Sequence, residues 1–434
     1  MNQETQDITQ RAMAAKQASY AMAALDGEVK DNALQAIAAG LLSNAKAILS
    51  ANEADLARSR EENLAAPLLK RLVFDRSKLE ETVEGVRSTM SLADPVGKML
   101  MATELDEGLE LFRISCPIGV MGIIFESRPD ALVQISTLCL KSGNAVLLKG
   151  GREATYTNRV LFDIIRDASI AAGLPEGWIH LMEGREEVNA MLALDEYVDL
   201  IIPRGSNAFV RYIMDHSRIP VMGHADGICH AYVDAAANIE RAVPLVFDSK
   251  TQYVAVCNAL ETLLVHSQVA EAFLPMMKQA LDEKDVALYG DDRVQAIIDC
   301  KPATEQDWKT EYLDYILSIR IVDSLDEAID HINRYGSGHT DMIVSEDKEA
   351  VDRFMQRVDS GNVFANCSTR FSDGFKYGFG AEVGISTNKL HARGPVGLEG
   401  LVTYKYKLFG QGHVAADYAE KRKTFTHRAI DKRQ

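Results

Sequence analysis

Cys257 is the residue of this sequence best placed for covalent chemistry. It ends the short apolar run 253–256, precedes Asn258, and is soon followed by a second apolar, strand-like run at 261–266. A thiol at such a junction is carried by a loop on a rigid scaffold, and its thiolate is a strong nucleophile that can hold an acyl group as a thioester. An isolated cysteine in an apolar setting is more often a small core residue. The nucleophile interpretation therefore depends on the surrounding groups.

Basic residues in loops indicate how an anionic substrate would be held. Arg128 follows the apolar run 118–125, and Arg370 and Arg393 lie in loops near the C-terminal end of the chain. Guanidinium groups bind phosphate and carboxylate groups with paired hydrogen bonds. Three of them around one thiol would suit a doubly anionic substrate, although each by itself is also explained as a solvated surface charge.

Two short segments are candidates for binding a nicotinamide cofactor. Lys149 and Arg152 follow an apolar strand, where they could hold the ribose and the 2′-phosphate of NADP. Gly205 and Ser206 precede an amphipathic helix at 207–216, whose N-terminus would attract a phosphate. An ordinary strand-to-helix turn explains that segment equally well. The chain has no Gly-x-Gly-x-x-Gly after a strand, so the standard dinucleotide fingerprint is missing.

Composition excludes several classes of function. The formal net charge of -16 argues against nucleic acid and anionic membranes as partners. The six cysteines are widely spaced, which predicts free thiols, and His224 with Cys229 and His230 are too few for a metal site. The N-terminus lacks a signal peptide, and no run reaches the length of about 18 apolar residues that a membrane span requires. We expect a cytoplasmic protein without a metal.

The elements that must position these residues are those of an α/β protein. Residues 1 to about 100 have helical spacing of apolar positions, and from residue 118 apolar strands alternate with helices. Strands that are apolar throughout and joined by helices are typical of parallel sheets buried on both faces. The chain is too long for one core, so we predict two doubly wound domains. Alternating runs at 109–115 and 401–408 predict a small antiparallel flap for oligomerisation.

The predicted boundaries follow from these changes of pattern. A cleft between two different α/β domains is the favoured place for a site. The predicted parts are a cofactor-binding domain with its helical leader at 1–107 and 118–240, a catalytic cysteine domain at 241–399, the flap at 108–117 and 400–412, and a tail at 413–434.

Longer motifs point to a family. From about residue 10 to residue 412 the chain resembles the γ-glutamyl phosphate reductase (glutamate-5-semialdehyde dehydrogenase) family of the aldehyde dehydrogenase superfamily. That resemblance implies NADPH-dependent reduction of L-glutamyl 5-phosphate to L-glutamate 5-semialdehyde and phosphate, the second step of proline biosynthesis. The motifs that carry it are Pro117-Ile-Gly-Val-Met-Gly-Ile-Ile-Phe-Glu-Ser-Arg-Pro129, Cys139-Leu-Lys-Ser-Gly-Asn144, Gly227-Ile-Cys-His-Ala-Tyr-Val-Asp234, Val256-Cys-Asn-Ala-Leu-Glu-Thr-Leu-Leu-Val-His266, Tyr335-Gly-Ser-Gly-His339 and Gly384-Ile-Ser-Thr-Asn-Lys-Leu-His-Ala-Arg-Gly-Pro395.

The resemblance also implies roles for single residues. Cys257 matches the catalytic cysteine of the family. Lys149 falls where aldehyde dehydrogenases bind the adenosine ribose, Ser206 where they bind the pyrophosphate, and Glu311 where they bind the nicotinamide ribose. His224 falls where the hydrolytic members carry a water-activating glutamate, and a reductase of an acyl phosphate must not hydrolyse its thioester.

Several assignments stay open at the level of sequence. The backbone N–H of Cys257 would stabilise an oxyanion, with Asn258 as a further donor. Arg128, Arg370, Arg393 and His224 are the candidates for binding the substrate. A homo-oligomer is expected, and a glutamate 5-kinase is a candidate partner. Two other functions fit the same pattern, a coenzyme A-acylating aldehyde dehydrogenase and a catalytically silent structural relative.

Overall fold

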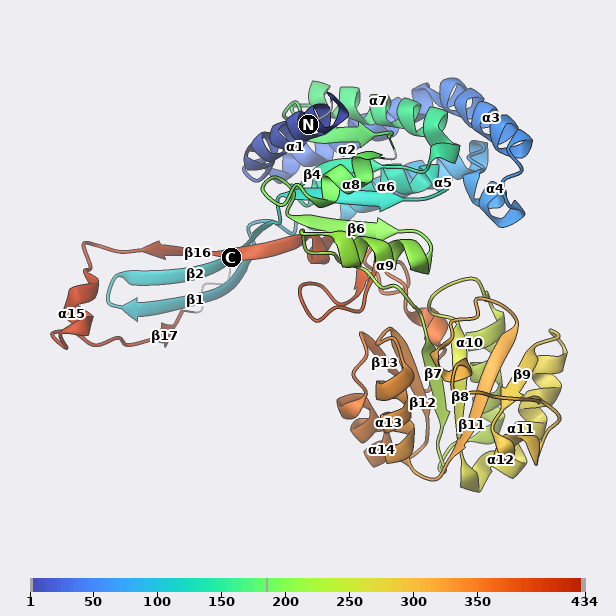
Figure 1. Cartoon of the computed structure of the whole chain (residues 1–434). Helices are drawn as coiled ribbons and strands as arrows, with labels where there is room; N and C mark the ends of the chain where they lie inside the picture. The colour runs from blue at the N-terminus through green and yellow to red at the C-terminus, as the bar shows by residue number, and fades with distance from the viewer. Residues whose placement is uncertain (1–2, 185, 431–434) are drawn as a thin grey trace.

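The computed structural model describes residues 3–184 and 186–430. Figure 1 shows two α/β units joined by extended segments, with an arm of antiparallel strands that projects from the first unit. The predicted fold class, two parallel-sheet units with a small antiparallel sheet, is confirmed. Residues 1–2 of the predicted leader and 431–434 of the predicted tail lie outside the described residues.

The first unit is built on a four-stranded parallel sheet with strand order β5-β4-β3-β6. Its strands are mostly apolar because helices cover both faces, and Lys149 and Arg204 are the last residues of β4 and β6. They are β3 (Val120–Phe125), β4 (Ala145–Lys149), β5 (Ile179–Met182) and β6 (Leu200–Arg204). The helices are α1 (Gln3–Met22), α2 (Gly27–Ser43), α3 (Ala45–Glu61), α4 (Ala66–Leu72), α5 (Arg76–Ser91), α6 (Pro129–Lys141), η1 (Arg152–Ala154), α7 (Thr155–Ala171), α8 (Glu186–Leu192) and α9 (Asn207–His216).

The second unit has a seven-stranded sheet with order β10-β9-β11-β8-β7-β12-β13, and all its strand pairs are parallel. The strands are β7 (Cys229–Val233), β8 (Leu260–His266), β9 (Ala287–Gly290), β10 (Lys301–Pro302), β11 (Ile316–Val322), β12 (Thr340–Val344) and β13 (Asn362–Ala365). The helices are α10 (Ile239–Thr251), α11 (Ser267–Asp282), α12 (Asp292–Gln295), η2 (Asp307–Lys309), α13 (Leu325–Tyr335), α14 (Lys348–Arg357) and η3 (Thr369–Phe371).

The structure differs from the predicted boundaries at 240 and 399. Strand β7 lies between β8 and β12, so the second sheet begins before residue 241. The segment 381–401, with β14 (Gly384–Ser386), β15 (Gly394–Val396) and η4 (Leu398–Leu401), returns to the first unit and adds side chains such as Val383 and Leu401 to its core. A change of sequence pattern marks an element but not the sheet that it joins, and packing decides that choice.

The arm is a four-stranded antiparallel sheet with order β16-β2-β1-β17. Strands β2 (Leu109–Pro117) and β16 (Val402–Phe409) pair over their whole length, as the predicted flap requires. The structure adds β1 (Met99–Asp106) and the short β17 (Arg428–Ala429), and between β16 and β17 lies α15 (Ala415–Ala419). The sequence of β1 favours a helix, but its backbone pairs with β2 in an antiparallel ladder. Tertiary pairing therefore overrides the local preference.

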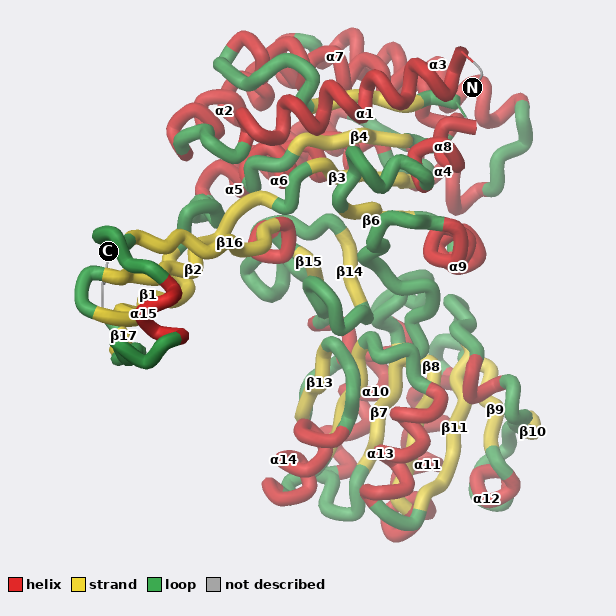
Figure 2. Tube along the Cα trace, turned by 60° about the vertical axis from the view of Figure 1, so that its left-hand side comes forward, coloured by secondary structure: helices red, strands yellow, loops and turns green. Residues whose placement is uncertain are grey.

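The tail is held against this arm by the pairing of β17 with β1 and by side-chain contacts. Tyr418 donates a hydrogen bond of 2.8 Å to Asp106 and stacks on Phe425 with ring centroids 4.2 Å apart. In the part of the chain described here, no single helix is long and apolar enough to cross a membrane, and α2 with α3 meets that test only as a pair bent by 67°. These two helices pack against α7, among the helices of the first unit (Figure 2).

Candidate active site

The loop that carries Cys257 connects α10 to β8 and is fixed at both of its ends. Lys250, near the end of α10, and Glu261, at the start of β8, form an ion pair of 2.7 Å whose side chains are both 0% exposed. Burial raises the pKa of Glu261 to about 7 and lowers the pKa of Lys250. Glu261 also accepts a hydrogen bond of 3.2 Å from the backbone N–H of Leu313. The cysteine loop is therefore tied to the segment that holds Glu311.

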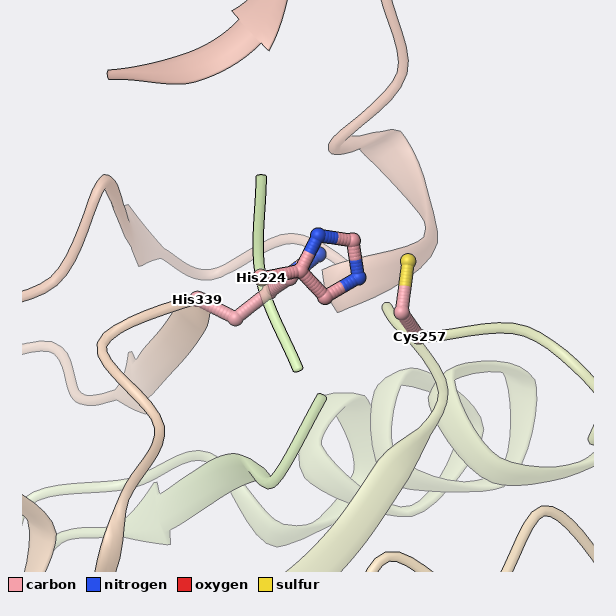
Figure 3. A group of neighbouring side chains, drawn as sticks. All are labelled: His224, Cys257 and His339. Atoms are coloured by element: carbon pink, nitrogen blue, oxygen red, sulfur yellow. The ribbon is translucent and has the colours of Figure 1, made fainter. Parts of the chain in front are cut away.

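Cys257 is half-buried and faces two imidazole rings. One donor atom of each of Cys257, His224 and His339 lies within 4.8 Å of the other two (Figure 3). The two rings are nearly perpendicular, with centroids 4.8 Å apart. Burial lowers the pKa of His224, so its ring is neutral near pH 7. His224 was predicted from the sequence to lie in the reaction centre. His339 was part of the motif 335–339, but no role was predicted for it.

Two guanidinium groups lie near enough to Cys257 to interact with it electrostatically. Arg204 ends β6, and burial lowers its pKa against the opposing effects of Glu382 and Cys257. Arg370 follows β13, and burial lowers its pKa also, again opposed by Cys257. Sequence reasoning predicted Arg370 but missed Arg204, although the segment Pro203-Arg204-Gly205 at a strand end was a usable signal.

The other two predicted substrate arginines have different surroundings. Arg393 forms an ion pair of 3.1 Å with Asp359 and also donates to the Asp359 carbonyl oxygen. Arg128 precedes α6 and acts electrostatically on Arg204. The structure thus places Arg128 near Arg204, on the side of the Cys257 site, while Arg393 is paired with the Asp359 carboxylate.

Asn258 is buried. Its side-chain Nδ2 donates a hydrogen bond of 2.7 Å to the Ser372 carbonyl oxygen. The backbone carbonyl oxygen of Asn258 accepts a hydrogen bond of 2.8 Å from the Thr369 hydroxyl. These bonds attach the cysteine loop to the segment after β13. Asn258 therefore fixes the loop, and the backbone N–H groups are the better placed donors for an oxyanion.

Glu311 lies where the two units meet. Its carboxylate accepts a hydrogen bond from Asn207, the first residue of α9. The Glu311 carboxylate also lies close to Gly227. A Cβ atom added to Gly227 would be 2.6 Å from Glu311 Oε1 and 2.3 Å from the backbone carbonyl oxygen of Cys257. Only glycine leaves room for this contact. Glu311 is thereby held between the N-terminus of α9 and the cysteine loop.

The carboxyl ends of β3, β4 and β6 bring the predicted cofactor residues to one edge. Ile124 pairs with Lys149 and Phe125 pairs with Arg204. Lys149 donates to the Gly150 carbonyl oxygen at 2.6 Å. A hollow at this edge is lined by Gly150, Gly151, Arg152, Thr155, Asn158, Leu181, Met182 and Glu183. Phosphate-binding dinucleotide sites occur at such edges.

The charges at this edge fit a dinucleotide. Arg152 is 81% exposed and paired with Glu62, and so exposed an ion pair is weak enough to be exchanged for a phosphate. Gly205 and Ser206 precede α9, and the Ser206 hydroxyl makes no capping bond there. The Ser206 N–H donates to Glu126, whose pKa is raised by burial. Lys149, Arg152 and the α9 N-terminus would hold the phosphates and riboses.

Fold and site together define the class of protein. The aldehyde dehydrogenase family model matches residues 2–299 and 297–384. The chain therefore belongs to the aldehyde dehydrogenase family. Within this family its relatives at high identity are γ-glutamyl phosphate reductases.

Those relatives cover the chain almost completely. The chain is 64% identical to γ-glutamyl phosphate reductase of Ruminiclostridium cellulolyticum over 98% of its own length and 99% of the relative. It is 56% identical to γ-glutamyl phosphate reductase 1 of Synechocystis, with 95% and 96% covered. The crystal structure of the Thermotoga maritima γ-glutamyl phosphate reductase matches with a TM-score of 0.92 at 38% identity, covering 94% of this chain and 99% of that one.

Proposed function

We propose that this chain reduces L-glutamyl 5-phosphate to L-glutamate 5-semialdehyde and phosphate, as a glutamate-5-semialdehyde dehydrogenase of proline biosynthesis. The observation that carries the proposal is the half-buried Cys257 thiol, which lies against two imidazoles and in the field of two guanidinium groups. The same charges suit the phosphate and carboxylate groups of this substrate.

The chain's own groups account for the acyl-transfer half of the reaction. The thiolate of Cys257 attacks the C5 carbonyl carbon, and backbone N–H groups of the cysteine loop stabilise the oxyanion. The bond between C5 and the phosphate oxygen then breaks, and phosphate leaves beside Arg204 or Arg370. The neutral ring of His224 accepts the thiol proton, which supplies the thiolate.

A nicotinamide cofactor follows from the family, and when bound it supplies the hydride that reduces the thioester. We assign its binding to Lys149, Arg152, Gly205, Ser206 and Glu311. The two cations at the β4 edge favour NADP(H), because a 2′-phosphate can replace Glu62 as the partner of Arg152. Equal kcat/KM values with NADH and NADPH would contradict this preference.

The remaining proposals concern assembly and place in the cell. The exposed apolar side chains of β16 support a homo-oligomer formed through the arm. A cytoplasmic location and a glutamate 5-kinase partner, which would supply the acyl phosphate, fit the proposed reaction.

The function is tested in the reverse direction with L-glutamate 5-semialdehyde. NADPH formation should require inorganic phosphate, should not be supported by coenzyme A, and should be lost by orders of magnitude in Cys257→Ala. The matched control is Cys116→Ala, on β2 of the arm, which should retain turnover. Activity with coenzyme A in place of phosphate would establish an acylating aldehyde dehydrogenase instead.

A further inference from the structure

Three segments that are distant in the sequence bring metal-binding atoms together around Cys257. His224 lies before β7, His339 lies before β12, and Cys257 lies between α10 and β8. Their donor atoms fall within 4.8 Å of one another, and Figure 3 shows the two histidine side chains beside Cys257. One cysteine and two histidines form a ligand set that zinc uses in proteins.

His339 provides an independent sign of a ligand. Its side chain is 0% exposed, yet its Nε2 makes no hydrogen bond within the described parts of the chain. A buried polar atom without a partner carries a free-energy cost. A bound cation among these three side chains would satisfy this nitrogen.

The outer nitrogens of both rings are already anchored. His224 Nδ1 lies 2.8 Å from the Ile385 carbonyl oxygen, so Nδ1 carries the proton and Nε2 keeps its lone pair. His339 Nδ1 lies 2.8 Å from Thr340 Oγ1 and 3.7 Å from Cys229 Sγ. Histidines that bind metals are oriented in this way by partners of the second nitrogen.

We infer that the Cys257 centre binds Zn²⁺ reversibly through the Cys257 thiolate and the Nε2 atoms of His224 and His339. The cation replaces the thiol proton, which is released to solvent, and the fourth position is left to water. Zinc bonds of about 2.0–2.3 Å require the three ligand atoms to approach to about 3.5 Å. Glu311 and Glu382 favour the positive charge, while Arg204 and Arg370 oppose it.

Zinc in this position would be an inhibitor, because it occupies the sulfur lone pair that must attack the acyl carbon. This consequence rests on the proposed function, whereas binding itself does not. It also departs from the sequence interpretation, which predicted no metal from His224, Cys229 and His230.

Zinc binding is measured on the full chain without substrate, by competition with a coloured chelator at buffered free Zn²⁺. We expect one zinc per chain, with affinity reduced about 10- to 100-fold or more in His339→Gln, His224→Gln and Cys257→Ser. The matched control His216→Gln, at the exposed end of α9, should bind as the unmodified chain does. Co²⁺ should show the thiolate charge-transfer absorption, and Cys257→Ser should lack it.

Unchanged zinc affinity in His224→Gln, or binding that persists in Cys257→Ser, would overturn the inference. The thermal midpoint of each variant is recorded, and if His339→Gln does not fold, the less buried His224→Gln decides. Zinc should also stop phosphate-dependent turnover, and EDTA should restore it. An enzyme that binds zinc but fails the phosphate assay would refute the proposed function and leave the metal site standing.

Discussion

At the scale of single residues, the site depends on charges that surround one sulfur atom. Cys257 is flanked by the imidazole rings of His224 and His339, and it interacts with guanidinium groups that come from opposite units of the fold. Arg204 lies at the end of the first sheet, and Arg370 lies in the segment that follows the second sheet. The two side chains would therefore bind the anionic groups of the substrate from opposite sides. Arg393, although it was also predicted from sequence, already has the Asp359 carboxylate as a partner.

Arg204 interacts with Cys257, whereas Arg393 is paired with Asp359, and the two should therefore differ in their effect on turnover. Arg204→Gln should reduce kcat/KM for the phosphate-dependent reaction about 10- to 100-fold, because a charge-assisted hydrogen bond to an anion contributes about 1.5–3 kcal/mol. Arg393→Gln serves as the matched control and should change kcat/KM by much less. Steady-state kinetics with varied phosphate measures both. A larger loss in Arg393→Gln than in Arg204→Gln would reverse the assignment.

At the scale of elements, buried polar groups hold the cysteine loop and the second sheet in place. The Lys250–Glu261 pair connects α10 to β8 beneath Cys257. Replacing both members of a buried ion pair by neutral groups is often tolerated, whereas removing one leaves an uncompensated charge. The pair is therefore expected to position the loop more than to stabilise the fold.

Lys250→Met and Glu261→Gln should each lower the free energy of unfolding by about 3–5 kcal/mol. The double variant should regain most of that loss, because glutamine still accepts from the Leu313 N–H and no charge remains buried. Denaturant unfolding of the two single variants and the double variant measures these changes in stability. Comparing kcat with KM in each variant tests whether the pair positions the Cys257 loop. Additive losses of stability in the double variant would show that the two charges act independently.

His331 of α13 predicts how stability depends on pH. Its Nδ1 lies 3.1 Å from the Arg320 guanidinium, and burial is the main reason that its pKa falls to about 2. Between that pKa and the ordinary value of 6.5, the unfolded chain binds a proton that the folded chain does not. Stability contributed by this residue is thus present above pH 6.5 and lost as the pH falls.

The slope of unfolding free energy against pH below 6.5 should drop by about 1.4 kcal/mol per pH unit in His331→Gln. The exposed His216→Gln is the control and should retain the slope of the unmodified chain. Urea unfolding at several pH values between 4 and 7 provides the measurement. An unchanged slope would mean that folding does not depress the pKa of His331.

At the scale of the whole molecule, the arm presents an apolar edge that the single chain does not cover. β16 is the outer strand of its sheet, and Tyr404, Tyr406, Leu408 and Phe409 are 50–58% exposed. An edge strand with such side chains is prone to pair with another chain. This is the structural basis for the proposed homo-oligomer.

Tyr406→Asp should therefore shift the chain toward a monomer, since burying a carboxylate at an apolar interface is costly. Lys407→Asp, on the opposite face of the same strand, is the matched control and should leave assembly unchanged. Light scattering coupled to size-exclusion chromatography measures the mass of each. A monomeric unmodified chain at micromolar concentration would contradict the role of the arm.

The sequence by itself determined the local features of this protein. The apolar run 120–125 is a strand in the structure because burial on both faces demands continuous apolar side chains. The predicted strand-like run 261–266 is also a strand, in which the buried Glu261 is paired with Lys250. The position of Cys257 at a loop between a helix and a strand, and the residues at the carboxyl ends of β4 and β6, follow from the same patterns.

Only the tertiary structure decided which distant residues meet. Arg204, His339 and the Lys250–Glu261 pair could be recognised as parts of the site only once two sheets and their loops were packed together. β1 was predicted within a helical leader and became a strand because β2 offered its edge. Periodicity records which side of an element is buried, and it carries no information on the neighbour that buries it.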